Sequence, residues 1–293
     1  MKQNDIITHP REGTMTYRSI FVHADDSEAC DRRLATAAGI ARAFPAQLKA
    51  AYLVPTSQVT PFASAVLRGD AKDRWFRQTA EAHDAVKARF HAIAAEAGVT
   101  DAVWAAPRVD PIGAAVLHSR YSDLAIIGQP PRDEVNAAFS AEIAHAVVTS
   151  SGRPVLFVPY IGSQKTLGER VLIAWKDSRE SARAVADALP FLKGAKKVHA
   201  LAIMQEDDAD ARELRAEQEV AAFLKRHDVD ATVRRLVAPD IEAGELLLSQ
   251  ASDLGVDLIV MGGYSRPRLT QLVWGGVTSI MLTSMTVPVL MSH

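Results

Sequence analysis

Two apolar periodicities alternate along the chain and together predict an α/β protein. Short continuous apolar runs, typical of strands buried on both faces, are separated by longer segments in which apolar residues recur every three or four positions. In the first part of the chain, the runs expected to form strands are residues 18–23, 47–54, 101–105, 123–127 and 154–158. In the second part, they are residues 170–175, 198–204, 231–236, 257–261 and 287–291.

Three segments between these runs have the pattern of amphipathic helices. The apolar faces expected for two of them consist of Leu34, Ala37, Ala38 and Ala41 in one and Ala182, Val185, Ala186 and Leu189 in the other. Ser27 and Ser178 precede these segments, and we expect each serine to cap its helix. The third segment, residues 208–227, is acidic at its start and basic at its end, which suits the helix dipole.

The chain contains an internal repeat. Segments that resemble one another in pairs are residues 17–27 and 169–178, residues 121–128 and 255–262, and residues 153–158 and 287–291. Because the three landmarks recur in the same order, we infer a duplicated domain. The first copy is longer, and we expect its extra residues to form a long mobile loop between Pro55 and Asp70, where prolines and a glycine interrupt any regular period.

The length of 293 residues also favours two domains over one. We expect a disordered leader over residues 1–15, a first domain over 16–160, a linker over 161–168 and a second domain over 169–293. Continuous apolar strands separated by helices predict a doubly wound, five-stranded parallel sheet in each domain. Ligands of such sheets bind beyond the carboxyl ends of the strands, where the strand order reverses.

Composition excludes several classes of function. A formal net charge of -2 gives no global attraction for nucleic acid or anionic membranes, and no apolar run approaches the length of about 20 residues that spans a bilayer. The single cysteine, Cys30, cannot form an intramolecular disulfide, and we expect it to be a buried packing residue in a cytoplasmic protein. The histidines have no zinc-site spacing, and no catalytic triad motif is present, so we predict neither a metal site nor catalytic residues.

The segment from Met261 to Thr278 resembles the nucleotide loop of universal stress proteins, whose pattern is G-x-x-G-x9-G-[ST]. Together with the strand order, the Pro-Val-Leu last strand and the duplication, this resemblance covers nearly the whole chain. It implies two tandem domains of the adenine nucleotide alpha hydrolase-like fold. In that family, glycines let the backbone approach ribose and phosphate, and amides at a helix start bind the anion.

Two positions of the loop depart from the family pattern. Gly262 and Gly275 match its first and third glycines, whereas Ser265 replaces the second glycine and Gly276 replaces the final serine or threonine. The substitution at Gly276 removes a hydroxyl ligand but leaves the backbone N–H, and Thr278 lies close enough in sequence to compensate. Ser265 adds a side chain where a close phosphate approach favours glycine.

Each copy retains a different half of the family's site. The acidic residue that ATP-binding members carry after their first strand is Asp25 in the first copy, but the corresponding residue in the second copy is Lys176. In the first copy, Pro130 and Pro131 remove two N–H donors from the position where phosphate would need them. We therefore expect nucleotide only in the second copy, where Lys176, Arg266 and Arg268 could neutralise phosphate charge.

The resemblance implies ATP or AMP as the ligand. The residues expected to form the site in the second copy are Ala174, Trp175, Lys176, Ile203, Met261, Gly262, Gly263, Ser265, Arg266, Arg268, Gly275, Gly276, Val277 and Thr278. Trp175 and Trp274 frame a pocket in one interpretation and are packing residues in the other.

Three functions are compatible with the sequence. The first is a stress-response binding protein whose halves form an intrachain version of the family's dimer along their last strands, with an unidentified protein partner and with pairing of two chains left open. The second is a nucleotide-free scaffold or a binder of another small ligand. The third is a slow ATPase or nucleotidyl transferase, against which stands the lack of a carboxylate pair near the loop to hold Mg²⁺.

Overall fold

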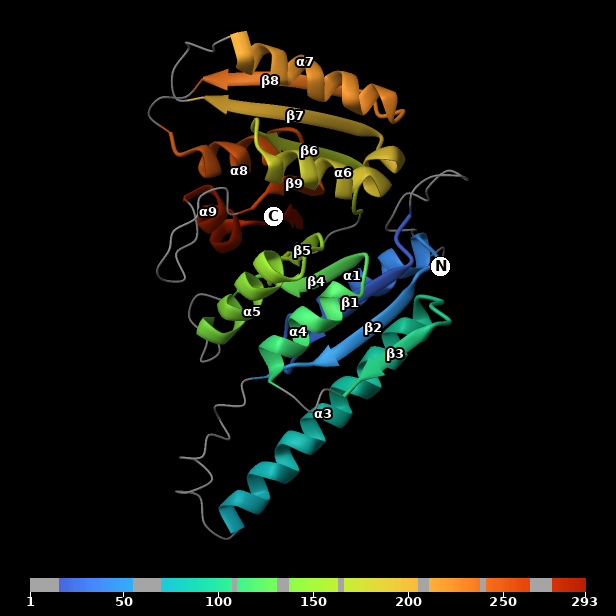
Figure 1. Cartoon of the computed structure of the whole chain (residues 1–293). Helices are drawn as coiled ribbons and strands as arrows, with labels where there is room; N and C mark the ends of the chain where they lie inside the picture. Colours follow the sequence, from blue (N-terminus) through green and yellow to red (C-terminus); the bar gives the residue numbers. More distant parts are fainter. Residues whose placement is uncertain are drawn as a thin grey trace.

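The structure is a computed structural model that describes residues 16–54, 70–106, 110–130, 137–162, 166–204, 211–237, 241–263 and 276–293. Within these ranges, strands and helices alternate in two successive halves (Figure 1). The first half contains β1 (Ser19–Ala24), α1 (Cys30–Ala43), β2 (Gln47–Tyr52), α3 (Asp70–Glu96), β3 (Ala102–Ala105), α4 (Pro111–Arg120), β4 (Leu124–Gly128), α5 (Ala137–Ser150) and β5 (Val155–Val158). The second half contains β6 (Arg170–Trp175), α6 (Arg179–Gly194), β7 (Lys197–Met204), α7 (Ala211–Arg226), β8 (Ala231–Val237), α8 (Ala243–Asp253), β9 (Leu258–Gly262), α9 (Gly276–Ser284) and β10 (Val289–Ser292).

The strands join into one continuous sheet. Their order is β3-β2-β1-β4-β5-β10-β9-β6-β7-β8. Neighbours within each half run parallel, whereas β5 and β10 pair antiparallel, with Leu156 opposite Leu290. The predicted α/β class and the five-stranded parallel arrangement of each half are therefore confirmed. The two halves share one sheet because their last strands pair edge to edge.

Helices cover both faces of this sheet. One cluster of buried side chains lies between the sheet and α1, α3, α6 and α7, and a second lies between the sheet and α4, α5, α8 and α9. Strand order reverses between β1 and β4 in the first half and between β6 and β9 in the second. The carboxyl ends of these two pairs are therefore the places where a doubly wound sheet binds ligands.

Side chains also join the halves away from the paired strands. Tyr17 packs against Phe44 and Phe191, with ring centroids 5.1 and 5.5 Å away, and its hydroxyl donates to the carbonyl of Asp187 at 2.7 Å. The amide of Gln129 donates to the carbonyl of Leu282 at 2.9 Å. This last bond connects the residue after β4 to helix α9 of the other half.

The apolar face predicted for α1 is confirmed, whereas the face predicted for α6 is partly wrong. Leu34, Ala37, Ala38 and Ala41 are all buried in α1, as expected. In α6, however, Ala182 is exposed and Ala186 only partly buried, because Ala184 and Ala188 face the sheet beside Val185 and Leu189.

Ser178 caps α6 by accepting a hydrogen bond from the Ser181 amide at 3.2 Å. The expected cap at Ser27 is wrong, since its hydroxyl donates to Asp25 at 2.5 Å and α1 begins after Ala29 without a side-chain cap.

The first half is longer partly because of a helix. Helix α3 has 27 residues, whereas α7, which occupies the same place in the second half, has 16. The loop predicted between Pro55 and Asp70 lies outside the described residues, as does the predicted leader.

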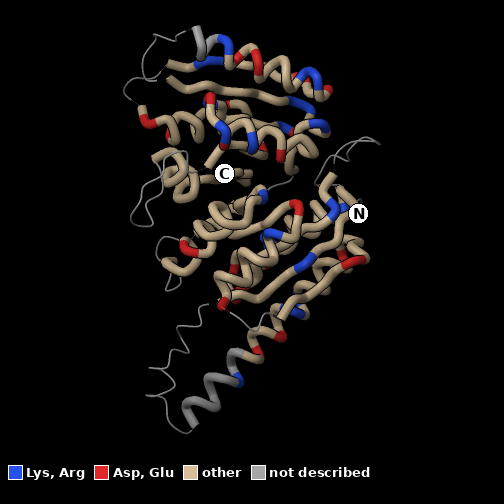
Figure 2. The backbone as a smooth tube through the Cα atoms, in the orientation of Figure 1, with Lys and Arg blue, Asp and Glu red and all other residues tan. Residues whose placement is uncertain are grey.

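Charge is distributed over both halves. Lysine and arginine residues are interspersed with aspartate and glutamate residues along the described chain (Figure 2). None of the described helices is both long enough and apolar enough to cross a membrane.

Candidate functional site

The carboxyl ends of β6, β7 and β9 bring several of the predicted site residues together. Ala174 pairs with Met261 across β6 and β9, and Trp175 pairs with Ala202, the residue before Ile203. Ala174, Ile203, Met261 and Val277 pack in the same apolar cluster, on the α8 and α9 face of the sheet. These apolar side chains therefore form one side of the candidate crevice.

Lys176 follows β6 at this edge and is the cation nearest the strand end in sequence. Its side chain is exposed, and within the described part of the chain it forms no ion pair. Helix α9 begins at Gly276, and Thr278 in its first turn is buried. A free ammonium group and the amides of a helix start are the groups that bind phosphate in proteins.

The glycines near the loop differ in whether packing requires a residue without a side chain. A Cβ built on Gly262 would lie 2.6 Å from the backbone nitrogen of Ser181, so only glycine lets the start of α6 pack against the end of β9. A Cβ on Gly263 would meet only ordinary contacts, the nearest at 3.6 Å, and one on Gly276 would meet no heavy atom of the described residues within 4 Å. Helix packing by itself therefore explains the glycine at 262, whereas nothing steric explains the glycine at 276.

One buried acid lies beside this edge. The Glu180 side chain is 8% exposed and accepts a hydrogen bond from Arg179 at 2.6 Å. Burial by itself would raise the pKa of this carboxyl, but the hydrogen bonds from Arg179, its own backbone and Ser178 lower the pKa below its ordinary value. Arg179 thus offsets the charge of this carboxylate, and Lys176 and Asp177 are exposed charged residues at the same strand end.

Four predicted site residues cannot be placed. Ser265, Arg266, Arg268 and Gly275 lie outside the described residues, as does Trp274. Trp175 can be placed, and its side chain packs in the apolar cluster on the α6 and α7 face, opposite the cluster that contains Ala174. Consecutive residues of a strand point to opposite faces, which is the reason for this separation.

The corresponding crevice of the first half is filled by an ion pair. The Arg33 guanidinium lies 2.8 Å from the Asp25 carboxylate, and Arg33 Nε donates to the carbonyl of His23 at 2.6 Å. The Arg33 side chain is 3% exposed, and a Cβ built on Gly128 would overlap with one of its terminal nitrogens. Arg33 therefore occupies the space above the end of β4.

This ion pair controls the ionisation of its neighbours. Burial by itself would raise the pKa of the Asp25 carboxyl, but Arg33, His23 and hydrogen bonds from Ser27 hold that pKa well below its usual value. Burial, and next the charge of Arg33, lower the pKa of His23 to about 4. Asp25 is thus a carboxylate and His23 is neutral at pH 7. Burial also raises the pKa of the Cys30 thiol, which is consistent with a packing role.

The strand register shows what replaces the ion pair in the second half. Strands β1 and β6 have the same length and place in the fold, so Asp25, one residue past β1, corresponds to Lys176, one residue past β6. The same register makes Arg33 correspond to Ala184, which is fully buried. Sequence reasoning missed Arg33, although an arginine four residues before Ala37 on the apolar face of α1 was a usable signal.

No group of three or more His, Cys, Asp or Glu side chains suited to a metal ion occurs within the described residues.

Comparison with known proteins gives the family. The family model described as "Universal stress protein family" matches residues 16–159 and again residues 168–293. No curated protein sequence matches the chain.

Among solved structures, a universal stress protein from Archaeoglobus fulgidus DSM 4304 is similar with a TM-score of 0.69 and 14% identity, over 93% of this chain and 94% of that one. A protein of unknown function from Pseudomonas aeruginosa PAO1 has a TM-score of 0.54 and 14% identity, over 94% of this chain and 92% of that one. A putative universal stress protein from Pseudomonas aeruginosa UCBPP-PA14 has a TM-score of 0.52 and 15% identity, with the same coverage of 94% and 92%. At these identities the structures show a common fold, and the family assignment comes from the matched segments. The chain therefore belongs to the universal stress protein family, with two copies of the family domain in tandem.

Proposed function

We propose that this chain is a stress-response binding protein that binds an adenine nucleotide, ATP or AMP, in its second half only. The observation that carries the proposal is the difference between the two crevices. The crevice of the first half is filled by the buried Arg33 side chain paired with Asp25, whereas the corresponding residues of the second half are Ala184 and the exposed Lys176. The second half thus lacks the buried arginine and carries an exposed positive charge where the first half carries a paired carboxylate.

The described groups of the second half suit the parts of a nucleotide. Ala174 and Ile203 are partly buried apolar residues that offer a surface to the base. Lys176 and the amides at the start of α9 offer positive charge to the phosphates, and the helix dipole adds to this attraction. We assign Arg266, Arg268 and Gly275 to the same site by resemblance to the family loop.

A link to the first half gives such a site a way to signal. Gln129 is buried and donates to the Leu282 carbonyl of α9, the helix whose first turn would receive the phosphate. A change in α9 on nucleotide binding would therefore reach the residue that follows β4. We propose that the first half, whose own crevice is closed, responds to nucleotide in this way and presents the altered surface to a protein partner.

Isothermal titration calorimetry with ATP, ADP and AMP tests the proposal. Lys176→Ala should weaken binding by about tenfold, because a hydrogen bond to a charged group contributes about 1.5 kcal/mol or more. Lys197→Ala is the matched control, because Lys197 is also an exposed lysine but is the first residue of β7, at the amino-terminal ends of the strands. This control should bind as the unmodified chain does.

Two results would contradict the proposal. If none of the three nucleotides releases heat at millimolar concentration, the chain is a nucleotide-free scaffold or binds another ligand. If purified protein releases phosphate steadily from ATP and Gly275→Val abolishes this release, the second half is an enzyme rather than a binding module.

A further inference from the structure

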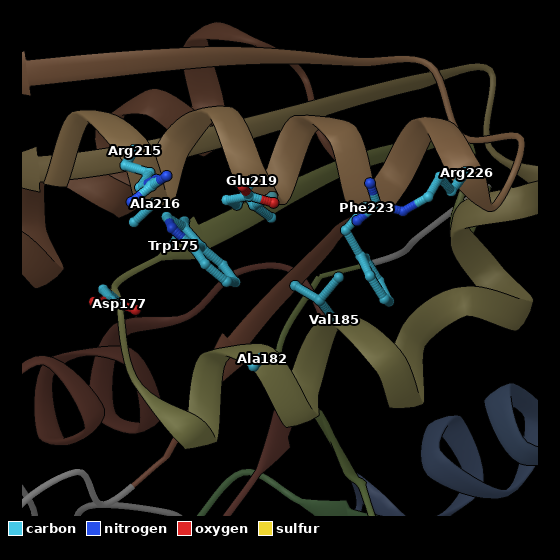
Figure 3. Close-up of a pocket in the computed structure, with 10 residues that line it drawn as sticks. Trp175, Asp177, Ala182, Val185, Arg215, Ala216, Glu219, Phe223 and Arg226 are labelled. Atoms are coloured by element: carbon cyan, nitrogen blue, oxygen red, sulfur yellow. The ribbon is translucent and has the colours of Figure 1, made fainter. Parts of the chain in front are cut away.

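A cavity of about 420 Å³ lies between α6 and α7, on the face of the second half opposite α8 and α9. Its apolar walls are Ala182 and Val185 of α6, Ala216, Val220 and Phe223 of α7, and Trp175 at the end of β6. Four charged residues also line it, namely Asp177, Arg215, Glu219 and Arg226 (Figure 3). This volume falls in the range of about 300–1,000 Å³ that holds one small organic molecule. The cavity is therefore large enough for a ligand of its own.

At the equivalent place of the first half, larger side chains lie among the described residues. Helices α3 and α7 end in equivalent turns, in which Gly98 and Asp228 have positive φ and Val99 and Val229 donate to the carbonyls of Ala94 and Leu224. This alignment, with the register of β1 and β6, makes three buried residues of the first half correspond to three cavity residues. The pairs are Leu34 and Val185, Val86 and Ala216, and Phe90 and Val220.

An ion pair also closes the first half at this place. Arg89 of α3 binds Asp31 of α1 at 2.8 Å, whereas the corresponding residues, Glu219 and Ala182, form no ion pair within the described chain. The cavity thus results from particular substitutions in the second copy and not from the fold that both copies share.

Polar groups lie at both ends of the cavity: Trp175, Arg215 and the acid Asp177 lie at one end, and Arg226 lies at the other (Figure 3). The indole nitrogen of Trp175 is buried and has no hydrogen-bond partner among the described residues. Arg215 lies at the same end of the cavity as Trp175, and Phe223 lies toward the other end, near Arg226 (Figure 3). The Arg215 side chain is exposed and forms no ion pair with any described residue. A buried N–H without an acceptor is costly, so this end favours a ligand that supplies oxygen acceptors.

We propose that this cavity binds a planar aromatic carboxylate. Its ring would lie among Trp175, Val185 and Phe223, and its carboxylate would accept hydrogen bonds from the Trp175 indole and Arg215. Aromatic side chains favour planar ligands by stacking, and a guanidinium beside an N–H donor favours a carboxylate over a neutral group. The site is separate from the proposed nucleotide site, because Lys176 and Gly276 line no part of this cavity.

The test uses the residues of the first half to close the cavity of the second. The triple variant Val185→Leu, Ala216→Val, Val220→Phe carries the side chains that already pack together between α1 and α3. We expect 2-naphthoate to bind the unmodified chain in calorimetry at millimolar concentration or below, and the triple variant to lose this binding while keeping its circular dichroism spectrum. Equal binding of 2-naphthoate to both proteins, or no binding to the unmodified chain, would overturn the proposal.

Two single variants test the donors without depending on the fold of the triple variant. Trp175→Phe keeps an aromatic ring but removes the N–H, and Arg215→Met keeps an unbranched side chain but removes the charge. Each should weaken 2-naphthoate binding by about tenfold, and 2-naphthalenemethanol should bind the unmodified chain less tightly than 2-naphthoate does. Unchanged affinity in both variants would refute the assigned carboxylate contacts.

A competition experiment separates this proposal from the nucleotide site. Saturating ATP should leave the affinity for 2-naphthoate unchanged, whether or not ATP itself binds elsewhere. Displacement of 2-naphthoate by ATP would mean that one site takes both ligands and would overturn the assignment of a second site.

Discussion

Arg33 holds the first half's crevice closed, and its removal should destabilise the chain strongly. In Arg33→Ala, the Asp25 carboxylate loses its cation at 2.8 Å and the His23 carbonyl loses its donor at 2.6 Å. Breaking a buried ion pair by removing one partner costs about 3–5 kcal/mol. The side chain of Asp25 is 18% exposed, so water can reach the orphaned carboxylate and the cost should lie near the lower end, about 3 kcal/mol.

The opposite substitution should cost more. Asp25→Ala leaves a guanidinium that is only 3% exposed and cannot lose its proton at neutral pH, so we expect a cost near 5 kcal/mol. In the double variant neither charge remains unpaired. Its loss of stability should therefore be smaller than the sum of the two single losses by about 2–3 kcal/mol.

Equilibrium urea unfolding at pH 7.5, followed by far-ultraviolet circular dichroism, measures all four proteins. Lys49→Ala, which replaces a charged residue of β2 that forms no ion pair within the described chain, is a suitable control. Additive losses in the double variant, or a cost below about 1 kcal/mol for Arg33→Ala, would refute the view that this pair fills and stabilises the crevice.

Three further results are expected. Burial lowers the pKa of His23 from 6.5 to about 4, so between these pH values His23 is protonated in the unfolded chain but neutral in the folded chain. The free energy of unfolding should therefore fall by about 3 kcal/mol as the pH drops from 6.5 to 4. His23→Gln should flatten this part of the stability profile in urea unfolding, and an unchanged slope would rule out His23 as its cause. Gly276→Ser restores the family's hydroxyl where a Cβ meets no atom of the described residues within 4 Å, and should tighten nucleotide binding about fivefold in calorimetry without loss of thermal stability; weaker binding would count against phosphate at the start of α9. Gly262→Ala should cost about 1–3 kcal/mol because its Cβ would lie 2.6 Å from the Ser181 backbone, whereas Gly263→Ala should cost little, and equal melting temperatures for the two variants would contradict this packing argument.

The sequence determined the framework of this protein. All ten expected strands are present to within two residues at either end, because a strand buried on both faces must be apolar along its whole length. The duplication was also readable, since its landmarks are segments of backbone structure. Asp25 and Lys176 were identified as residues that distinguish the two copies, because each directly follows a strand whose end could be predicted.

Only the tertiary structure decided which side chains meet at those strand ends. Arg33 fills the first crevice because α1 crosses the end of β4, and Trp175 faces the α6 and α7 cavity because it lies on the opposite face of β6 from Ala174. Ser27 binds Asp25 instead of capping α1, and Ala182 is exposed beside the cavity between α6 and α7 instead of packing on the sheet, because the start and rotation of each helix are set by packing on the sheet. Apolar periodicity is a local property that the sequence displays directly. Contacts between side chains far apart in the chain depend on strand register and helix placement, which arise only when the whole sheet is assembled.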